Sequence, residues 1–168
     1  VLGLEDQEVE EICRRGAASG IAVAASFNAP GQVAVSGDMA ALKRVGELAR
    51  EAGAKRVIPL EVSGAFHSPL MEPMLDDFAR IASTVSYDSP EICLISNRTG
   101  REIGPDQMNA SYWVSHIRET VRFHEGLTQA INLGCKVFIE TGPDPVLCGL
   151  GRRSFQDSSL SWLPSLKQ

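Results

Sequence analysis

The first third of the chain alternates between strand-like and helix-like hydrophobic patterns. Apolar residues recur three and four positions apart in two segments, 5–18 and 39–52, which predicts two amphipathic helices. Short apolar runs bounded by turn residues predict four strands, at residues 1–4, 21–27, 32–36 and 56–62. The order βαββαβ is that of a ferredoxin-like unit, which we assign to residues 1–62.

The remaining residues, 63–168, continue the alternation with longer connections. Helical spacing of apolar residues predicts helices at 69–85, 105–117, 121–133 and 146–153. An apolar run at 92–96 predicts a short buried strand, and the run at 136–140 predicts a further strand. Strands that alternate with helices favour a parallel sheet covered by helices, so the fold class is α/β. We expect residues 63–168 to form part of a larger α/β body.

A histidine follows the predicted strand 56–62. Ser68 is a suitable N-cap for the next helix and Pro69 a suitable first helical residue. His67 therefore lies in a loop between a strand and a helix, a frequent place for catalytic side chains in α/β proteins. An imidazole can exchange a proton near neutral pH, so His67 is a candidate general base. The alternative is a structural or incidental loop histidine.

Charge and composition exclude several classes of function. A chain of 168 residues can bury a proper core, and its formal net charge is −5. No basic cluster is longer than Arg152-Arg153, which argues against binding to nucleic acid. No apolar run approaches the ~18 residues of a membrane span, so we expect no membrane association. The spacing of the histidines and cysteines fits no metal site, and we expect buried reduced thiols in a cytoplasmic protein.

Four sequence motifs of the chain occur in the same order in one protein family. They are the hairpin segment FNAPGQVAVSGD at 27–38, GAFHSPLMEPM at 64–74, YWVSHIRETVRF at 112–123 and FIETGPDPVL at 138–147. These stretches closely resemble acyltransferase domains that load malonyl-type extender units in fatty acid and polyketide synthesis. The third stretch and the tail at 162–166 are most similar to modular polyketide synthases. The resemblance covers nearly the whole chain and implies an α/β-hydrolase-like body for residues 63–168.

The resemblance also implies a reaction and roles for four residues. A malonyl unit would pass from coenzyme A to the phosphopantetheine thiol of an acyl carrier protein by a Ser–His ping-pong mechanism, without a tightly bound cofactor. His67 would be the base, and the bulk of Phe66 would favour malonyl over methylmalonyl groups. Asn28 would lie near the acyl pocket, and a backbone carbonyl at or near His116 would orient His67. The alternatives are turn packing for Phe66, a turn residue for Asn28 and a partly exposed helix-end side chain for His116.

One feature of the family is missing from the sequence. No Gly-x-Ser-x-Gly elbow, which carries the nucleophilic serine in the family, is present in the chain. We therefore expect the serine, and the arginine that holds the malonyl carboxylate, in a missing N-terminal part of the same domain. The alternative function is a non-catalytic docking module, an acyltransferase relative that binds a carrier protein or a partner enzyme.

Overall fold

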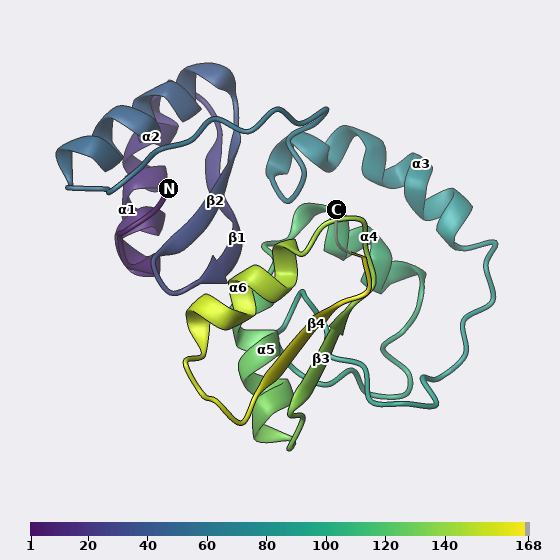
Figure 1. The fold of residues 1–168 in the computed structure, drawn as a ribbon. Helices are drawn as coiled ribbons and strands as arrows, with labels where there is room; N and C mark the ends of the chain where they lie inside the picture. The colour runs from purple at the N-terminus through teal and green to yellow at the C-terminus, as the bar shows by residue number, and fades with distance from the viewer. Residues whose placement is uncertain (167–168) are drawn as a thin grey trace.

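The computed structural model describes residues 1–166, and it contains short elements joined by long loops (Figure 1). In chain order these elements are α1 (Asp6–Gly16), η1 (Ala17–Ser19), β1 (Ala22–Ala29), β2 (Gln32–Gly37), α2 (Met39–Glu51), η2 (Pro69–Met71), α3 (Glu72–Ala82), α4 (Ala110–Arg118), α5 (Phe123–Asn132), β3 (Val137–Glu140), α6 (Val146–Ser154) and β4 (Ser161–Pro164). Each predicted helix is present, with ends shifted by a few residues. Within the described residues, no helix is long and apolar enough to cross a membrane.

The N-terminal part is an antiparallel hairpin covered on one face by two helices. β1 and β2 pair from Ala22↔Gly37 to Ala29↔Gln32, and α1 and α2 pack against them (Figure 1). Leu2 forms single bridges to Gln32 and to Arg56. The order across the sheet is therefore Arg56, Leu2, β2, β1, which is the order of a ferredoxin-like unit whose first and last strands along the chain are reduced to single bridges.

The predicted strand at 56–62 is wrong beyond its first residue. After Arg56 the chain lies in an extended loop with no strand partner. The apolar side chains of Ile58, Leu60 and Val62 are exposed there, and Pro59 has no N–H to donate to a neighbouring strand. A strand-like sequence forms a strand only when a neighbour completes its hydrogen bonds, and the described residues supply none.

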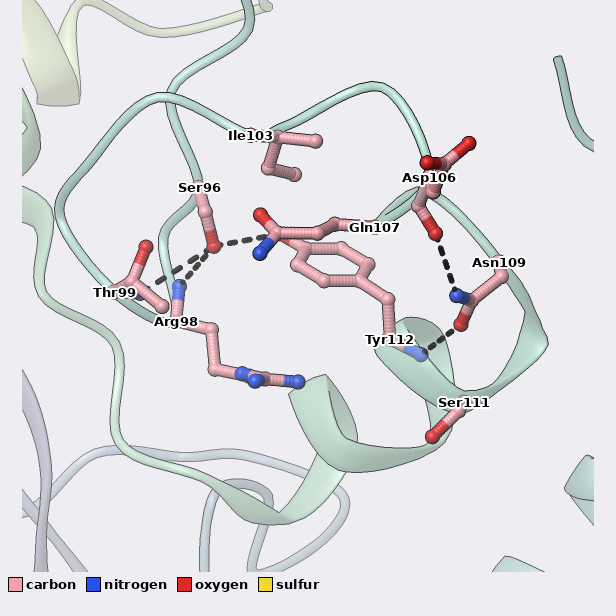
Figure 2. Close-up of a pocket in the computed structure, with 9 residues that line it drawn as sticks. All are labelled: Ser96, Arg98, Thr99, Ile103, Asp106, Gln107, Asn109, Ser111 and Tyr112. Carbon is pink, nitrogen blue, oxygen red and sulfur yellow. Dashed lines mark hydrogen bonds between the residues drawn. The ribbon is translucent and has the colours of Figure 1, made fainter. Parts of the chain in front are cut away.

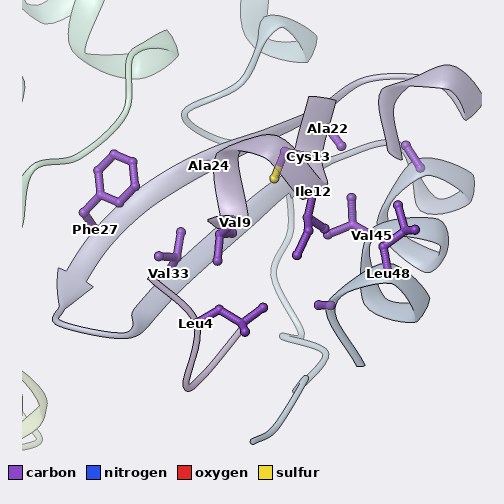
Figure 3. Packing of buried hydrophobic residues seen from close by; sticks show 12 residues of the cluster. Leu4, Val9, Ile12, Cys13, Ala22, Ala24, Phe27, Val33, Val45 and Leu48 are labelled. Atoms are coloured by element: carbon purple, nitrogen blue, oxygen red, sulfur yellow. The ribbon is translucent and has the colours of Figure 1, made fainter. Parts of the chain in front are cut away.

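The main core lies between the hairpin and its helices. Val9 and Ile12 of α1 meet Val45 and Leu48 of α2 over Val33 of β2 (Figure 3). In each helix the two named residues are three positions apart and therefore lie on the same face. This spacing explains why hydrophobic periodicity predicted both helices. Every member of this cluster lies within residues 1–57.

The C-terminal part contains a two-stranded parallel sheet. β3 pairs with β4 from Val137↔Ser161 to Glu140↔Pro164, and the rings of Phe138 and Trp162 stack 4.4 Å apart on one face. On the other face the side chains of Val137, Ile139 and Leu163 are exposed. β4 was not predicted from the sequence.

Two expectations about burial are wrong in this part. The run 92–96 forms only the bridge Ile95↔Glu102, and the Ile92 side chain is 82% exposed. The cysteines were all expected to be buried, but only Cys13 and Cys148 are; Cys93 and Cys135 are exposed. Both errors concern loops in which an apolar side chain finds no packing partner among the described residues.

An extended segment after α4 connects the two parts. Val121 N–H donates to the Ala25 carbonyl (2.9 Å), and Phe27 N–H donates to the Val121 carbonyl (2.9 Å). The Thr120 hydroxyl donates to the carbonyl of Ala24 (2.8 Å). Residues 120–121 therefore lie alongside β1 and fix the end of α4 relative to the hairpin.

Alanine substitutions at two glycines of α6 should change the free energy of unfolding in opposite directions. A Cβ at Gly151 would overlap the Trp162 ring, whereas a Cβ at Gly149 would meet no atom within 4 Å. We expect Gly151→Ala to lower the free energy of unfolding by about 1–3 kcal/mol through overpacking. Gly149→Ala should raise it by about 0.5–1 kcal/mol, because alanine is the better helix former. Urea unfolding of both variants measures this, and equal signs would contradict the packing of α6 on β4.

Candidate active site

The backbone at His67 adopts an uncommon conformation that its neighbours hold in place. Its φ is 59°, in the left-handed region that residues other than glycine rarely occupy. His67 N–H donates to the carbonyl of Ile117 (2.9 Å). The buried Ser68 hydroxyl donates to the Ala65 carbonyl (2.6 Å) and accepts from Leu70 N–H (3.3 Å), so Ser68 is the helix N-cap that the sequence predicted. Strain of this kind, on the order of 1–3 kcal/mol, often accompanies functional positions.

The imidazole of His67 is oriented by a backbone carbonyl. Its Nδ1 lies 2.9 Å from the carbonyl oxygen of Glu119. Because a carbonyl can only accept a hydrogen bond, Nδ1 carries the proton and the lone pair of Nε2 is free. The site thus presents a base at Nε2.

The same contacts place His67 at the C-terminal end of α4. The carbonyls of Ile117 and Glu119 belong to the last turn of that helix and its C-cap, where carbonyls have no partner within the helix. The helix dipole gives this end a partial negative charge. It therefore stabilises the positive charge that His67 gains when Nε2 takes up a proton.

His116 is next to His67 but does not supply the orienting carbonyl. The two rings meet edge to face with centroids 5.6 Å apart, and the carbonyl that reaches Nδ1 is that of Glu119, three residues further on. The His116 ring also stacks on Tyr112 at 5.8 Å. Burial lowers the pKa of His116, the positive charges of His67 and Arg98 lower it further, and Glu119 acts in the opposite direction.

The two proposed substrate-contacting residues are placed differently. Phe66, 49% exposed, directly precedes His67, and its ring lies over Gly64, where a Cβ would come within 3.2 Å of it. Asn28 lies near the end of β1 and accepts a hydrogen bond from the Ser26 hydroxyl (2.7 Å). Within residues 1–166, Asn28 makes no hydrogen bond to Phe66 or His67. Of the three residues predicted beside His67, only Phe66 and His116 therefore lie next to it.

A polar hollow is lined by residues of α4 and of the loop before it. Its volume is about 260 Å³, and Ser96, Arg98 and Tyr112 line its inner wall (Figure 2). The Ser96 hydroxyl and the Tyr112 phenol are buried and lie 3.0 Å apart. Arg98 Nε lies 3.1 Å from Glu119 Oε2, so this wall touches the residue that orients His67.

Sequence reasoning missed Arg98 and the carbonyls of Ile117 and Glu119. Arg98 lies in an Asn-Arg-Thr-Gly stretch that reads as an ordinary turn. The position of a backbone carbonyl cannot be inferred from residue type. The predicted break between two helices near Arg118-Glu-Thr nevertheless indicated where a helix would end with unpaired carbonyls. As for metals, the described part of the chain contains no group of three or more His, Cys, Asp or Glu side chains that could hold an ion.

The depressed pKa of His116 should appear in the stability of the protein. We expect NMR titration to place this pKa below its ordinary value of 6.5. The unfolded chain then binds the proton more tightly, so the free energy of unfolding falls as the pH drops from above 6.5 through the folded-state pKa. His116→Gln should reduce this loss between about pH 7.5 and 5.5. Titration of His116 at or above 6.5 would contradict the prediction.

The chain is similar in sequence to known proteins. Residues 2–168 match the acyl transferase domain family. Polyketide synthase GfsA of Streptomyces halstedii is 42% identical over 137 residues, which are 82% of this chain and 2% of that protein.

Solved structures share the fold. The acyltransferase domain from the second module of the salinomycin polyketide synthase superposes with a TM-score of 0.90 at 36% identity, covering 98% of this chain and 38% of that one. A type II polyketide synthase acyl-carrier protein in complex with its malonyl-transacylase gives 0.92 at 28% identity, covering 100% of this chain and 54% of that one. The chain thus spans about half or less of each protein it matches here. The predicted α/β fold class is confirmed, and the chain belongs to the acyl transferase domain family.

Proposed function

We propose that this chain is the histidine-bearing part of an acyltransferase that moves a malonyl unit from coenzyme A to the phosphopantetheine thiol of an acyl carrier protein. The observation that carries the proposal is the orientation of His67. Its Nδ1–H is bound to the Glu119 carbonyl, which leaves Nε2 as a base at the negative end of a helix. Family membership adds the reaction class, and the complex of a malonyl-transacylase with its carrier protein supports the partner.

In the first half-reaction, Nε2 of His67 takes the proton of a serine hydroxyl from outside this chain. The serine oxygen attacks the thioester carbonyl of malonyl-CoA, and the C–S bond breaks. The imidazolium then returns the proton to the departing thiolate of coenzyme A, leaving a malonyl-serine ester. The imidazolium of His67 contacts the carbonyl end of α4 throughout this step.

The second half-reaction runs the same steps in reverse with a different thiol. Nε2 takes the proton of the phosphopantetheine thiol, whose sulfur attacks the malonyl-serine ester. The C–O bond breaks, and the imidazolium returns the proton to the serine oxygen. No net proton is gained or lost over the cycle, and no tightly bound cofactor takes part.

The bare face of the β3–β4 sheet supports the proposal that another part of the domain completes this body. Parallel strands are usually covered on both faces, yet Val137, Ile139 and Leu163 are exposed. An apolar face of this kind fits further strands and helices, which would include the serine and the arginine of the acyl site. The self-contained core within residues 1–57 supports the division into a small subdomain at 1–62 and a body at 63–168.

We further propose that Phe66 and Asn28 contact the acyl group. Phe66 precedes the base directly and is half exposed, so its ring can bound the space beside the reacting carbonyl. A bulky ring there disfavours the α-methyl group of methylmalonyl-CoA, an effect of about 1–3 kcal/mol per methyl. Asn28 has an amide that is only partly engaged, by the Ser26 hydroxyl.

A docking module without activity is the second candidate. The absence of a Gly-x-Ser-x-Gly elbow in this chain favours it. A docking surface, however, has no need of a histidine held in a left-handed conformation with one ring nitrogen fixed and the other free. The geometry at His67 therefore favours the enzyme.

Intact-mass spectrometry of the full-length protein that contains this chain tests the reaction. After incubation with malonyl-CoA we expect a malonyl mass increase that transfers to an added acyl carrier protein. His67→Ala should slow the acylation by about 10²–10⁴-fold, the usual contribution of a general base. His124→Gln, a change outside the site, should leave the rate unchanged. In the same assay, Phe66→Ser should raise the rate with methylmalonyl-CoA relative to malonyl-CoA by roughly tenfold.

Two results would contradict the proposal. Absence of any adduct on the full-length protein, together with binding of a carrier protein, would favour the docking module. An adduct that forms equally fast in His67→Ala would show that a different base acts.

A further inference from the structure

Arg98 lies near the ring of Tyr112 (Figure 2) and contacts the carboxylate of Glu119. Its Nε is 3.1 Å from Glu119 Oε2, and its guanidinium carbon is 5.7 Å from the centroid of the Tyr112 ring. The Nε–H is not aligned as a hydrogen bond and has no hydrogen-bond partner among the described residues. The contact with Glu119 is therefore an ion pair supported by a cation–π contact.

The backbone around Arg98 is firmly anchored. Arg98 N–H donates to the hydroxyl of Ser96 (3.0 Å), which is buried and in contact with the Tyr112 phenol. The neighbouring Asn97 carbonyl accepts from Arg122 N–H (2.6 Å). The turn that carries Arg98 is thus attached both to α4, through Tyr112, and to the segment that follows Glu119.

On the proposed function, we infer that Arg98 is a positioning residue for His67. By holding the Glu119 side chain against this anchored turn, Arg98 keeps the Glu119 carbonyl on Nδ1 of His67. The peptide after Glu119 is held on its other side by the Thr120 hydroxyl on the Ala24 carbonyl. Removal of Arg98 would leave the Glu119 carbonyl held through the main chain alone, by the Glu119 N–H on the Ser115 carbonyl and by residues 120–121 on β1.

The effect should concern rate and not stability. The side chains of Arg98 and Glu119 are 31% and 45% exposed, and ion pairs of this exposure add little to folding. A shift of the acceptor would tilt the imidazole, and small misplacements of a catalytic group lower rates by up to about 10²-fold. Substrate affinity should not change, because Arg98 has no proposed contact with the acyl group.

Malonyl transfer by the full-length protein carrying Arg98→Met provides the kinetic test. We expect kcat to fall about tenfold to a hundredfold with KM and the melting temperature nearly unchanged. Glu119→Gln keeps the carbonyl but loses the ion pair, so it should show a similar loss. The double variant should be no slower than either single variant, because both remove the same interaction. Arg101→Met is the matched control, since Arg101 is exposed and makes no ion pair within residues 1–166.

A second measurement does not depend on activity. With ¹⁵N-labelled histidine, the Nδ1–H of His67 should exchange with water more slowly in the wild-type protein than in Arg98→Met, and Arg101→Met should match the wild type. Additive losses in the double variant, a rise in KM alone, or unchanged Nδ1–H exchange would each overturn the role of Arg98. A wild-type protein without malonyl transfer would refute the proposed reaction, while the exchange experiment would still decide whether Arg98 orients His67.

Discussion

Backbone hydrogen bonds at the end of α4 join three parts of the molecule. On one side, Val121 pairs with Ala25 and Phe27 of β1. On the other, the carbonyls of Ile117 and Glu119 hold the main chain and the ring of His67. These hydrogen bonds connect the hairpin to the imidazole through the end of α4. The position of the candidate base therefore depends on how the N-terminal part packs, although that part lends no hydrogen bond to the ring.

These hydrogen bonds also explain the conformation of His67. A left-handed histidine persists only where its surroundings determine it, and here the Ile117 carbonyl, the Glu119 carbonyl and the Ser68 cap act together. An acidic side chain at Nδ1 would hold the ring by charge. The carbonyl achieves the same orientation through the helix end, and Arg98 balances the carboxylate of Glu119 nearby. The site thus stabilises a transient positive charge without placing a permanent negative charge on the ring.

Local features of the fold could be predicted from the sequence, and features that depend on distant partners could not. Helical spacing placed α2, and side-chain chemistry placed the Ser68 cap, because both depend on residues within one turn. The run 56–62 has a strand-like pattern but lacks a neighbour, so it forms a single bridge at Arg56. Within the site, His67 was predictable by its type and loop, whereas the orienting carbonyl depends on where α4 ends. The sequence suggested a carbonyl at or near His116, but the carbonyl that orients the ring is that of Glu119, three residues further on. The role of Arg98 becomes visible only once this carbonyl is identified.

The protonation of the His67 ring tests the account most directly. We propose to measure the ¹⁵N chemical shifts of both ring nitrogens in the neutral protein, with His67→Gln as the assignment control. The hydrogen bond to Glu119 predicts a proton on Nδ1 and an unprotonated Nε2, ready to act as a base. A neutral ring with its proton on Nε2 would contradict the account, because the Glu119 carbonyl would then have nothing to accept and the base would face away from the substrate.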